Sequence, residues 1–262
     1  MKTKITLKGQ PGVMACHLTD IPGFPGGRFT LGYPEAIGDA ARPVWYGDLK
    51  PKWEVREDGT WFSQGIREGE LSYTLLVSAS EDWVSSEFRL TNLSDRVWKQ
   101  SFAFNCLQCA HDPAFRDHDC ERTWVRCGGE FKRLVELPRV CGPRPAVQLY
   151  SVEGAPPGRD IPFVANFQAT PDVVTEPWMA IRSRDRRRLV ATVSRPGLFL
   201  FQNREFSCIH AAAGFGEMKP GETASAVNKT YFVRATLPAW HRRMEKHFLT
   251  DGARLPHGKM AP

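Results

Sequence analysis

Residues 71–90 decide the fold and read LSYTLLVSASEDWVSSEFRL. Apolar side chains occupy every second position on either side of the central SEDW, which is the period of half-buried β-strands. The polar residues 80–83 separate the two runs, so the stretch predicts a β-hairpin. Turn-forming residues at 92–95 (Asn-Leu-Ser-Asp) then end the second strand.

Further runs with strand character lie on both sides of this hairpin. They are short and either apolar or alternating, and they occupy residues 4–8, 101–109, 122–127, 146–152, 179–183, 189–194, 198–202 and 225–234. Turn signals rich in Gly and Pro separate many of them, for example Pro-Pro-Gly at 156–158 and Pro-Gly at 196–197. Many short strands joined by frequent turns predict an all-β chain folded as a sandwich or barrel.

The domain organisation follows from where this pattern begins and ends. Residues 1–50 are rich in Gly and Pro, which predicts loops with at most one edge strand. We therefore expect a single β-sandwich domain over residues 1–250, with this loop-rich segment at its start. Residues 251–262 are expected to form a flexible tail.

One stretch, residues 238–250, has the pattern of a helix. Trp240, Met244 and Phe248 recur every four residues and form one apolar stripe opposite a basic face. The sequence predicts that this short C-terminal helix docks on the sandwich. Three histidines in or after it are expected at the surface: His241, His247 and His257.

Composition and charge exclude several classes of function. Of the 262 residues, 42% are hydrophobic and 24% are charged, which is typical of a globular chain. The net charge of +6 is mild and nucleic-acid-binding motifs are absent, so no nucleic-acid partner is expected. No apolar run approaches the roughly 18 residues of a membrane span, and the N-terminus lacks the apolar core of a secretory signal. The seven cysteines are expected to be reduced thiols in the cytoplasm, and the oligomeric state is left open.

Several motifs occur in an order that matches a known superfamily. Residues 88–95 (FRLTNLSD) precede residues 101–106 (SFAFNC), and a later series follows. That series consists of residues 184–197, 198–203, 208–210, 218–223 and 230–233. In this order the motifs resemble those of the galactose mutarotase-like superfamily, also called aldose epimerases. The resemblance implies an antiparallel β-supersandwich and a carbohydrate ligand.

The resemblance also implies where the chemistry departs from the family pattern. The family's catalytic histidine corresponds to Ser101 and its catalytic glutamate to His210. Serine is a poor proton donor near neutral pH, whereas histidine titrates there. The chain is therefore identified as a divergent member, and acid–base chemistry is expected to centre on His210. Small side chains at residues 211–214 leave space for a ligand beside it.

The segment 106–121 holds the densest group of thiol, imidazole and carboxylate side chains. His111 and Asp117 from this segment, together with Glu205, are expected to assist His210 in catalysis. A second set is expected to contact the sugar: Asn105, Asp119, His118, Trp124 and Arg122.

Three functions remain open. The first is an enzyme of the epimerase, lyase or hydrolase type that acts on a sugar or oligosaccharide in a concave face of the sheet. The second is a carbohydrate-binding module whose face is lined by tryptophans from the set Trp45, Trp53, Trp61 and Trp124. The third is a metalloprotein, because residues two apart on a strand share a face and Zn²⁺ accepts mixed Cys/His ligands. Its expected ligands are Cys109, His111, His118 and Cys120, and without such a metal no cofactor is expected.

Overall fold

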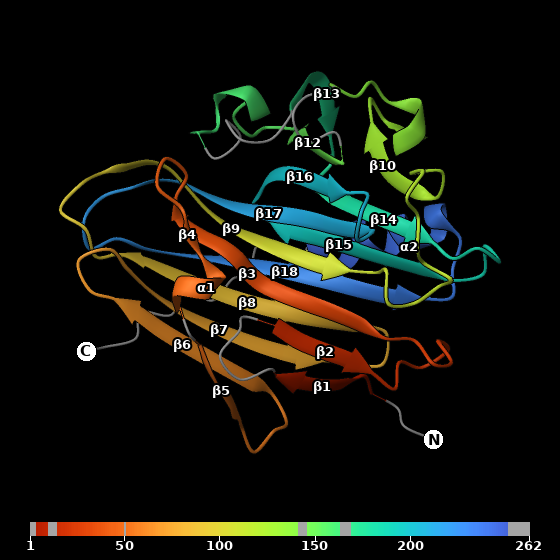
Figure 1. The fold of residues 1–262 in the computed structure, drawn as a ribbon, viewed down its shortest axis with the longest axis horizontal. Coiled ribbons are helices and arrows are strands. Elements are labelled where there is room, and N and C mark those ends of the chain that lie inside the picture. The colour runs from red at the N-terminus through yellow and green to blue at the C-terminus, as the bar shows by residue number, and fades with distance from the viewer. Residues whose placement is uncertain (1–3, 10–14, 50, 141–145, 163–168, 251–262) are drawn as a thin grey trace.

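The computed structural model describes residues 4–9, 15–49, 51–140, 146–162 and 169–250, and its strands form two packed layers (Figure 1). The strands of the first layer are, in spatial order, β1 (Thr6–Gly9), β2 (Ala15–Thr19), β3 (Phe29–Asp39), β9 (Trp98–Gln108), β17 (Cys208–Met218), β16 (Gly197–Asn203) and β12 (Val147–Val152). The strands of the second are β14 (Trp178–Arg182), β15 (Leu189–Arg195), β18 (Thr223–Val233), β8 (Trp83–Asn92), β7 (Leu71–Ala79), β6 (Trp61–Arg67) and β5 (Lys52–Val55). This arrangement confirms the predicted β-sandwich.

Short elements join the layers and flank them. β10 (Thr123–Cys127), β11 (Glu130–Arg133) and β13 (Ala169–Thr175) connect β12 with β14, and β4 (Val44–Trp45) pairs with β3. The helical elements are α1 (Tyr46–Leu49), α2 (Leu237–Met244), the 3₁₀ turns Leu134–Glu136 and Gly158–Asp160, and the π-helical turn Glu245–Thr250. β12 and β13 pair in parallel, so the sheet is mixed rather than purely antiparallel.

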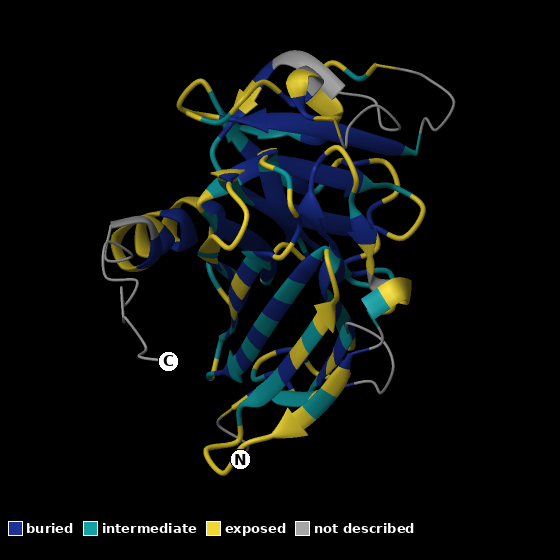
Figure 2. Cartoon of the chain, turned by 90° about the vertical axis from the view of Figure 1, so that its left-hand side faces the viewer, coloured by how far each residue is buried: buried dark blue, intermediate teal, exposed yellow. Residues whose placement is uncertain are grey.

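The predicted hairpin is confirmed. β7 and β8 pair in antiparallel register from Leu71 opposite Asn92 to Ala79 opposite Val84. Side chains along β7 alternate between buried and half-buried, and Figure 2 shows such bands along the lower strands. The buried members point between the layers, where they form the main core with residues such as Phe88 and Leu107. The period-two pattern therefore determined both the strands and the face that they bury.

The N-terminal segment was predicted as loops, and this prediction holds for residues 20–28 but is wrong for Ala15–Thr19 and Phe29–Asp39, which form strands. β3 is 11 residues long and lies between β2 and β9, inside the first layer. Its pairing with β9 shifts register between Gly32 and Ala36, around Pro34. A proline without an N–H is tolerated at such a bulge, because the ladder hydrogen bond is already interrupted there. Gly and Pro thus mark a bulged strand here rather than a loop.

Helix α2 covers the outer face of β14, β15 and β18. Its stripe of Trp240, Met244 and Phe248 is buried against Trp178 and Tyr231, which confirms the predicted docking. Thr236 caps the first turn by accepting a hydrogen bond from the Ala239 N–H. No helix among the described residues combines the length and hydropathy that a bilayer crossing requires.

His241 was predicted at the surface of this helix but is buried. Its Nε2 lies 2.6 Å from Glu176 Oε2, and Phe131 and Trp178 flank the ring. Glu176 also accepts hydrogen bonds from Arg126 and from the Trp178 indole. The Glu176 carboxylate is the polar partner that makes burial of the His241 ring possible. Helix periodicity alone does not reveal this partner, so it predicted an exposed histidine.

Replacing Glu176 with Gln is expected to destabilise the protein by about 2 kcal/mol at pH 7 and by much less at pH 3. Burial raises the pKa of Glu176, but the hydrogen bonds from His241 and Trp178 and the nearby Arg126 charge outweigh it and hold the pKa below 4.5. A lowered folded-state pKa stabilises above the unfolded-state value, and that stabilisation is lost as the pH falls through the folded-state value. Urea unfolding at both pH values measures the difference. An equal loss at both would contradict the ionic role, and the exposed Glu68→Gln serves as control.

Candidate functional site

His210 lies on β17 in a closely packed aromatic setting. Its side chain is only 3% exposed, and its ring stacks on Phe104 with the centroids 4.8 Å apart and the planes at 6°. Phe201 packs edge-on at 4.9 Å. The Nδ1 atom lies 2.8 Å from the carbonyl oxygen of Phe201. Because a carbonyl can only accept, Nδ1 carries the proton, and Nε2 is directed to the other side of the ring.

Glu35 approaches His210 on that other side. Its Oε2 lies 3.5 Å from His210 Nε2, at the bulge of β3 described above. The Glu35 side chain is 28% exposed, yet Oε2 itself is buried and has no hydrogen-bond partner among the described residues. The compensation for this buried carboxylate oxygen is therefore its ion-pair contact with the His210 ring at 3.5 Å. Glu35 therefore connects the molecular surface with the buried imidazole.

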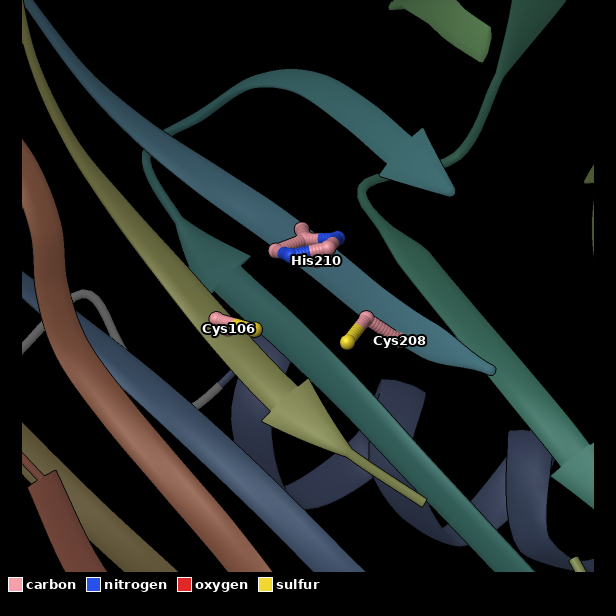
Figure 3. A group of neighbouring side chains, drawn as sticks. All are labelled: Cys106, Cys208 and His210. Carbon is pink, nitrogen blue, oxygen red and sulfur yellow. The ribbon is translucent and has the colours of Figure 1, made fainter. Parts of the chain in front are cut away.

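Two cysteine thiols complete the cluster around His210. Figure 3 shows the sulfur of Cys106 on β9 and that of Cys208 on β17 directed toward one another beneath the imidazole. The two Sγ atoms and a ring nitrogen of His210 all lie within 4.8 Å of one another. A hydrogen bond with Cys208 and burial raise the pKa of the Cys106 thiol well above its usual value. Both strands are paired here, so the backbone holds these side chains on one face.

The groups around the imidazole favour its protonated form. Burial lowers the pKa of His210, but the neighbouring Cys106 and Glu35 outweigh burial and raise it to about 10. Cys106 is itself a neutral thiol at pH 7, so Glu35 is the neighbour that favours the charged ring near neutrality. In this state the ring can donate a proton but has no lone pair with which to accept one.

Asp117 and Arg122, predicted for catalysis and sugar binding, serve the loop that contains them. Asp117 is buried and accepts hydrogen bonds from Thr123 Oγ1 at 2.7 Å and from the Arg122 N–H at 3.0 Å. Arg122 Nη1 donates to the carbonyls of Ala114 and Arg182, both at 2.9 Å. These polar groups are therefore directed at the chain's own backbone and not at His210.

Four other residues predicted for catalysis or sugar binding lie at the surface. His111, His118, Asp119 and Glu205 are exposed. His118 Nδ1 lies 2.7 Å from the Arg204 carbonyl oxygen, and Asp119 lies 3.7 Å from the guanidinium of that arginine. His118 and Asp119 therefore contact Arg204. The structure does not bring the four residues together with His210.

The four predicted metal ligands do not converge either. Cys109 and Cys120 are buried, whereas His111 and His118 are exposed. Cys120 adopts a left-handed backbone with φ of 61°, which breaks the extended geometry on which the shared face was predicted. Within the described ranges, the grouping suited to a metal is Cys106, Cys208 and His210 instead.

Asn105 and Ser101 stabilise the sandwich from within. Asn105, predicted to contact the sugar, is fully buried; its Oδ1 accepts from the Ala211 N–H at 2.7 Å and its Nδ2 donates to Thr192 Oγ1 at 3.2 Å. Ser101 donates to the Gly216 carbonyl at 2.8 Å, which links β9 to β17. Trp124 is half-buried against the cluster beneath helix α2. None of these contacts faces the Glu35–His210 pair.

Sequence reasoning missed Glu35 and the arrangement around Trp45. Ala36 lies opposite Trp45 on one side and opposite Phe104 on the other, and directly opposed residues share a face. Trp45 is 38% exposed, so an indole lies on the sheet face that also carries Phe104 and the Glu35–His210 contact. Cys208 was detectable, because it precedes His210 by two residues on a predicted strand.

The comparisons with known proteins agree with this architecture. Neither a family model nor a curated protein matches the sequence. Among solved structures, part of an α-N-acetylgalactosaminidase from Bifidobacterium bifidum aligns with a TM-score of 0.53 and 9% identity, over 92% of this chain and 38% of that one. A galactose mutarotase-like protein from Lactobacillus casei aligns with 0.49 and 9% identity, over 89% and 98%. A putative aldose 1-epimerase from Escherichia coli aligns with 0.44 and 8% identity, over 88% and 99%. The predicted resemblance is confirmed as one of fold, and these neighbours are carbohydrate-related proteins.

Proposed function

We propose that the chain binds a carbohydrate on the face formed by β3, β4 and β9, with Glu35 and Trp45 as its principal contacts. The observation that carries this proposal is the pairing of β3 with β4, which places the exposed Trp45 opposite Ala36, next in sequence to Glu35, whose side chain is 28% exposed. Sugar hydroxyls supply donors to carboxylates, while the apolar face of a pyranose packs on an aromatic ring. The α-N-acetylgalactosaminidase with a similar fold supports a sugar as the ligand class.

Calorimetric titration with galactose, N-acetylgalactosamine and their disaccharides tests this proposal. Glu35→Gln and Trp45→Ala are each expected to weaken binding about tenfold or more, because a charge-assisted hydrogen bond or a stacking contact is worth about 1.4 kcal/mol or more. Two exposed residues outside this face, Glu205 and Phe206, provide matched controls as Glu205→Gln and Phe206→Ala. Equal weakening by the controls, or undiminished binding in both test variants, would refute the assignment.

The second candidate is the acid–base enzyme centred on His210 that the sequence predicts. The 3.5 Å approach of His210 Nε2 to Glu35 favours it, whereas the closed aromatic packing of the ring supports binding without turnover. Incubation of each bound sugar with the protein, followed by NMR of anomers, epimers and cleavage products, separates the two. Turnover that is lost in His210→Gln and kept in His241→Gln, a control in which a buried histidine also pairs with a half-buried glutamate, would establish the enzyme.

A further inference from the structure

We propose that Cys106, Cys208, His210 and Glu35 form a binding site for one Zn²⁺ ion. This site differs from the four ligands that the sequence suggested. It shares Glu35 with the proposed sugar contacts, but its two thiols and its imidazole belong to none of them, so it goes beyond carbohydrate binding. The six described cysteines all carry free thiols, so both sulfurs are available to a metal.

The positions of the donor atoms fit a tetrahedral metal. Three atoms that lie within 4.8 Å of one another place a central ion no more than about 2.8 Å from each, whereas Zn–S and Zn–N bonds are about 2.3 and 2.0 Å long. Small χ1 adjustments of Cys106 and Cys208 close this gap without moving the backbone. The two strands that supply the ligands are directly paired, as His210 lies on β17 next to the Ile209–Leu107 pair with β9.

Glu35 provides an anionic oxygen next to this cluster. Its Oε2 is buried, has no hydrogen-bond partner among the described residues and faces His210 Nε2. A buried carboxylate oxygen ordinarily meets a donor or a metal ion. The Glu35 carboxylate lies outside the group of atoms within 4.8 Å of one another, so it must turn toward the thiols to become the fourth ligand of a set of two sulfurs, one nitrogen and one oxygen, which Zn²⁺ accepts.

His210 is already oriented as a metal ligand. Its Nδ1–H donates to the Phe201 carbonyl at 2.8 Å, which fixes the ring and directs Nε2 toward the cluster. Metal-bound histidines ordinarily donate their second ring N–H to a carbonyl or carboxylate in this way. The stacked Phe104 and the edge-on Phe201 restrict rotation of the ring further.

Proton balance accompanies binding. Zn²⁺ displaces one proton from each of the two thiols, and the imidazole binds in its neutral form and so releases the proton that it holds in the metal-free protein. Two thiolates and one carboxylate then surround the divalent ion with a net charge of minus one. The released protons go to the buffer, so affinity rises with pH as it does for thiolate sites in general.

Metal analysis of the full chain tests the site. Protein purified with a phosphine reductant, stripped by chelator and dialysed against Zn²⁺ is expected to retain one equivalent by mass spectrometry. Replacement by Co²⁺ is expected to give thiolate-to-metal charge-transfer absorption and the intense visible bands of a tetrahedral ion. Less than about a tenth of an equivalent of zinc, or cobalt spectra without a thiolate band, would overturn the proposal.

Single variants locate the metal. Cys106→Ser and Cys208→Ser are expected to weaken Zn²⁺ binding at least 100-fold, and Glu35→Gln about tenfold. Cys109→Ser and Cys120→Ser, buried thiols of the set suggested by sequence, are the matched controls and should bind as the wild type does. Retention of stoichiometric zinc by a Cys106→Ser/Cys208→Ser double variant would overturn the site. Trp45→Ala affects only the sugar contacts, so loss of the carbohydrate proposal is distinguishable from loss of this one.

Discussion

Replacing Trp240 with Ala is expected to lower the free energy of unfolding by about 4 kcal/mol, because a large buried aromatic side chain leaves a cavity of matching size. Trp240 is fully buried and meets Trp178 edge-to-face, with the ring centroids 5.1 Å apart, and Tyr231 at 5.7 Å. These rings attach helix α2 to β14 and β18. Urea unfolding followed by circular dichroism measures the loss.

Trp240→Phe is the matched control for this prediction. The indole Nε1 is buried and has no hydrogen-bond partner among the described residues, so removing it relieves an unsatisfied donor. The smaller ring keeps most of the aromatic contact, and we expect the phenylalanine variant to lose less than about 1.5 kcal/mol. A loss as large as that of Trp240→Ala would show that the indole N–H contributes a bond that the packing does not reveal.

Replacing Asn105 with Leu is expected to destabilise the protein by about 3 kcal/mol, because it leaves buried polar groups without partners. The Ala211 N–H would lose its acceptor between the two layers, and Thr192 Oγ1 would lose one of the two amides that donate to it. Thermal and urea unfolding measure the effect. The cause is internal packing of the sandwich rather than contact with a sugar.

A double-mutant cycle with Thr192→Val checks this interpretation. Asn105 and Thr192 share a hydrogen bond at 3.2 Å, so their effects on stability should be non-additive by about 1 kcal/mol. Strict additivity would indicate that the two side chains act separately. A variant of Asn105 that keeps full stability but loses sugar binding would return this residue to the predicted substrate site.

Sequence patterns predicted the elements that depend on the periodicity of neighbouring residues. The alternation over residues 71–90 gave β7 and β8, and the spacing of Trp240, Met244 and Phe248 gave the docked helix. β3 was missed because its Gly and Pro residues are typical of loops, whereas here a bulge opposite β9 accommodates them. The β3 segment is a strand because it pairs with β2 and β9, and a single sequence contains little information about such pairing between distant segments.

Only the part of the candidate site that depends on local strand geometry was predictable from the sequence. Cys208 and His210 share a face through strand geometry alone, but Glu35 reaches them only through the β3 bulge. The segment 106–121 was predicted to contribute to the site because it is rich in thiol, imidazole and carboxylate side chains. Asp117 in this segment and Arg122 directly after it form hydrogen bonds within their own loop instead, which composition does not indicate. Residue chemistry identified the candidates, and tertiary contacts selected among them.

The most direct test of carbohydrate binding on the face of β3, β4 and β9 is a titration followed by ¹H–¹⁵N NMR. The indole N–H signal of Trp45 is assigned by its absence from the spectrum of Trp45→Phe. When a sugar that binds in the calorimetric titration is added, the Trp45 indole signal and the backbone amide signal of Glu35 are expected to shift progressively until the site is saturated. Shifts confined to Trp240 and its neighbours, around the 610 Å³ cavity beside helix α2, with the Trp45 signal unmoved, would contradict the account.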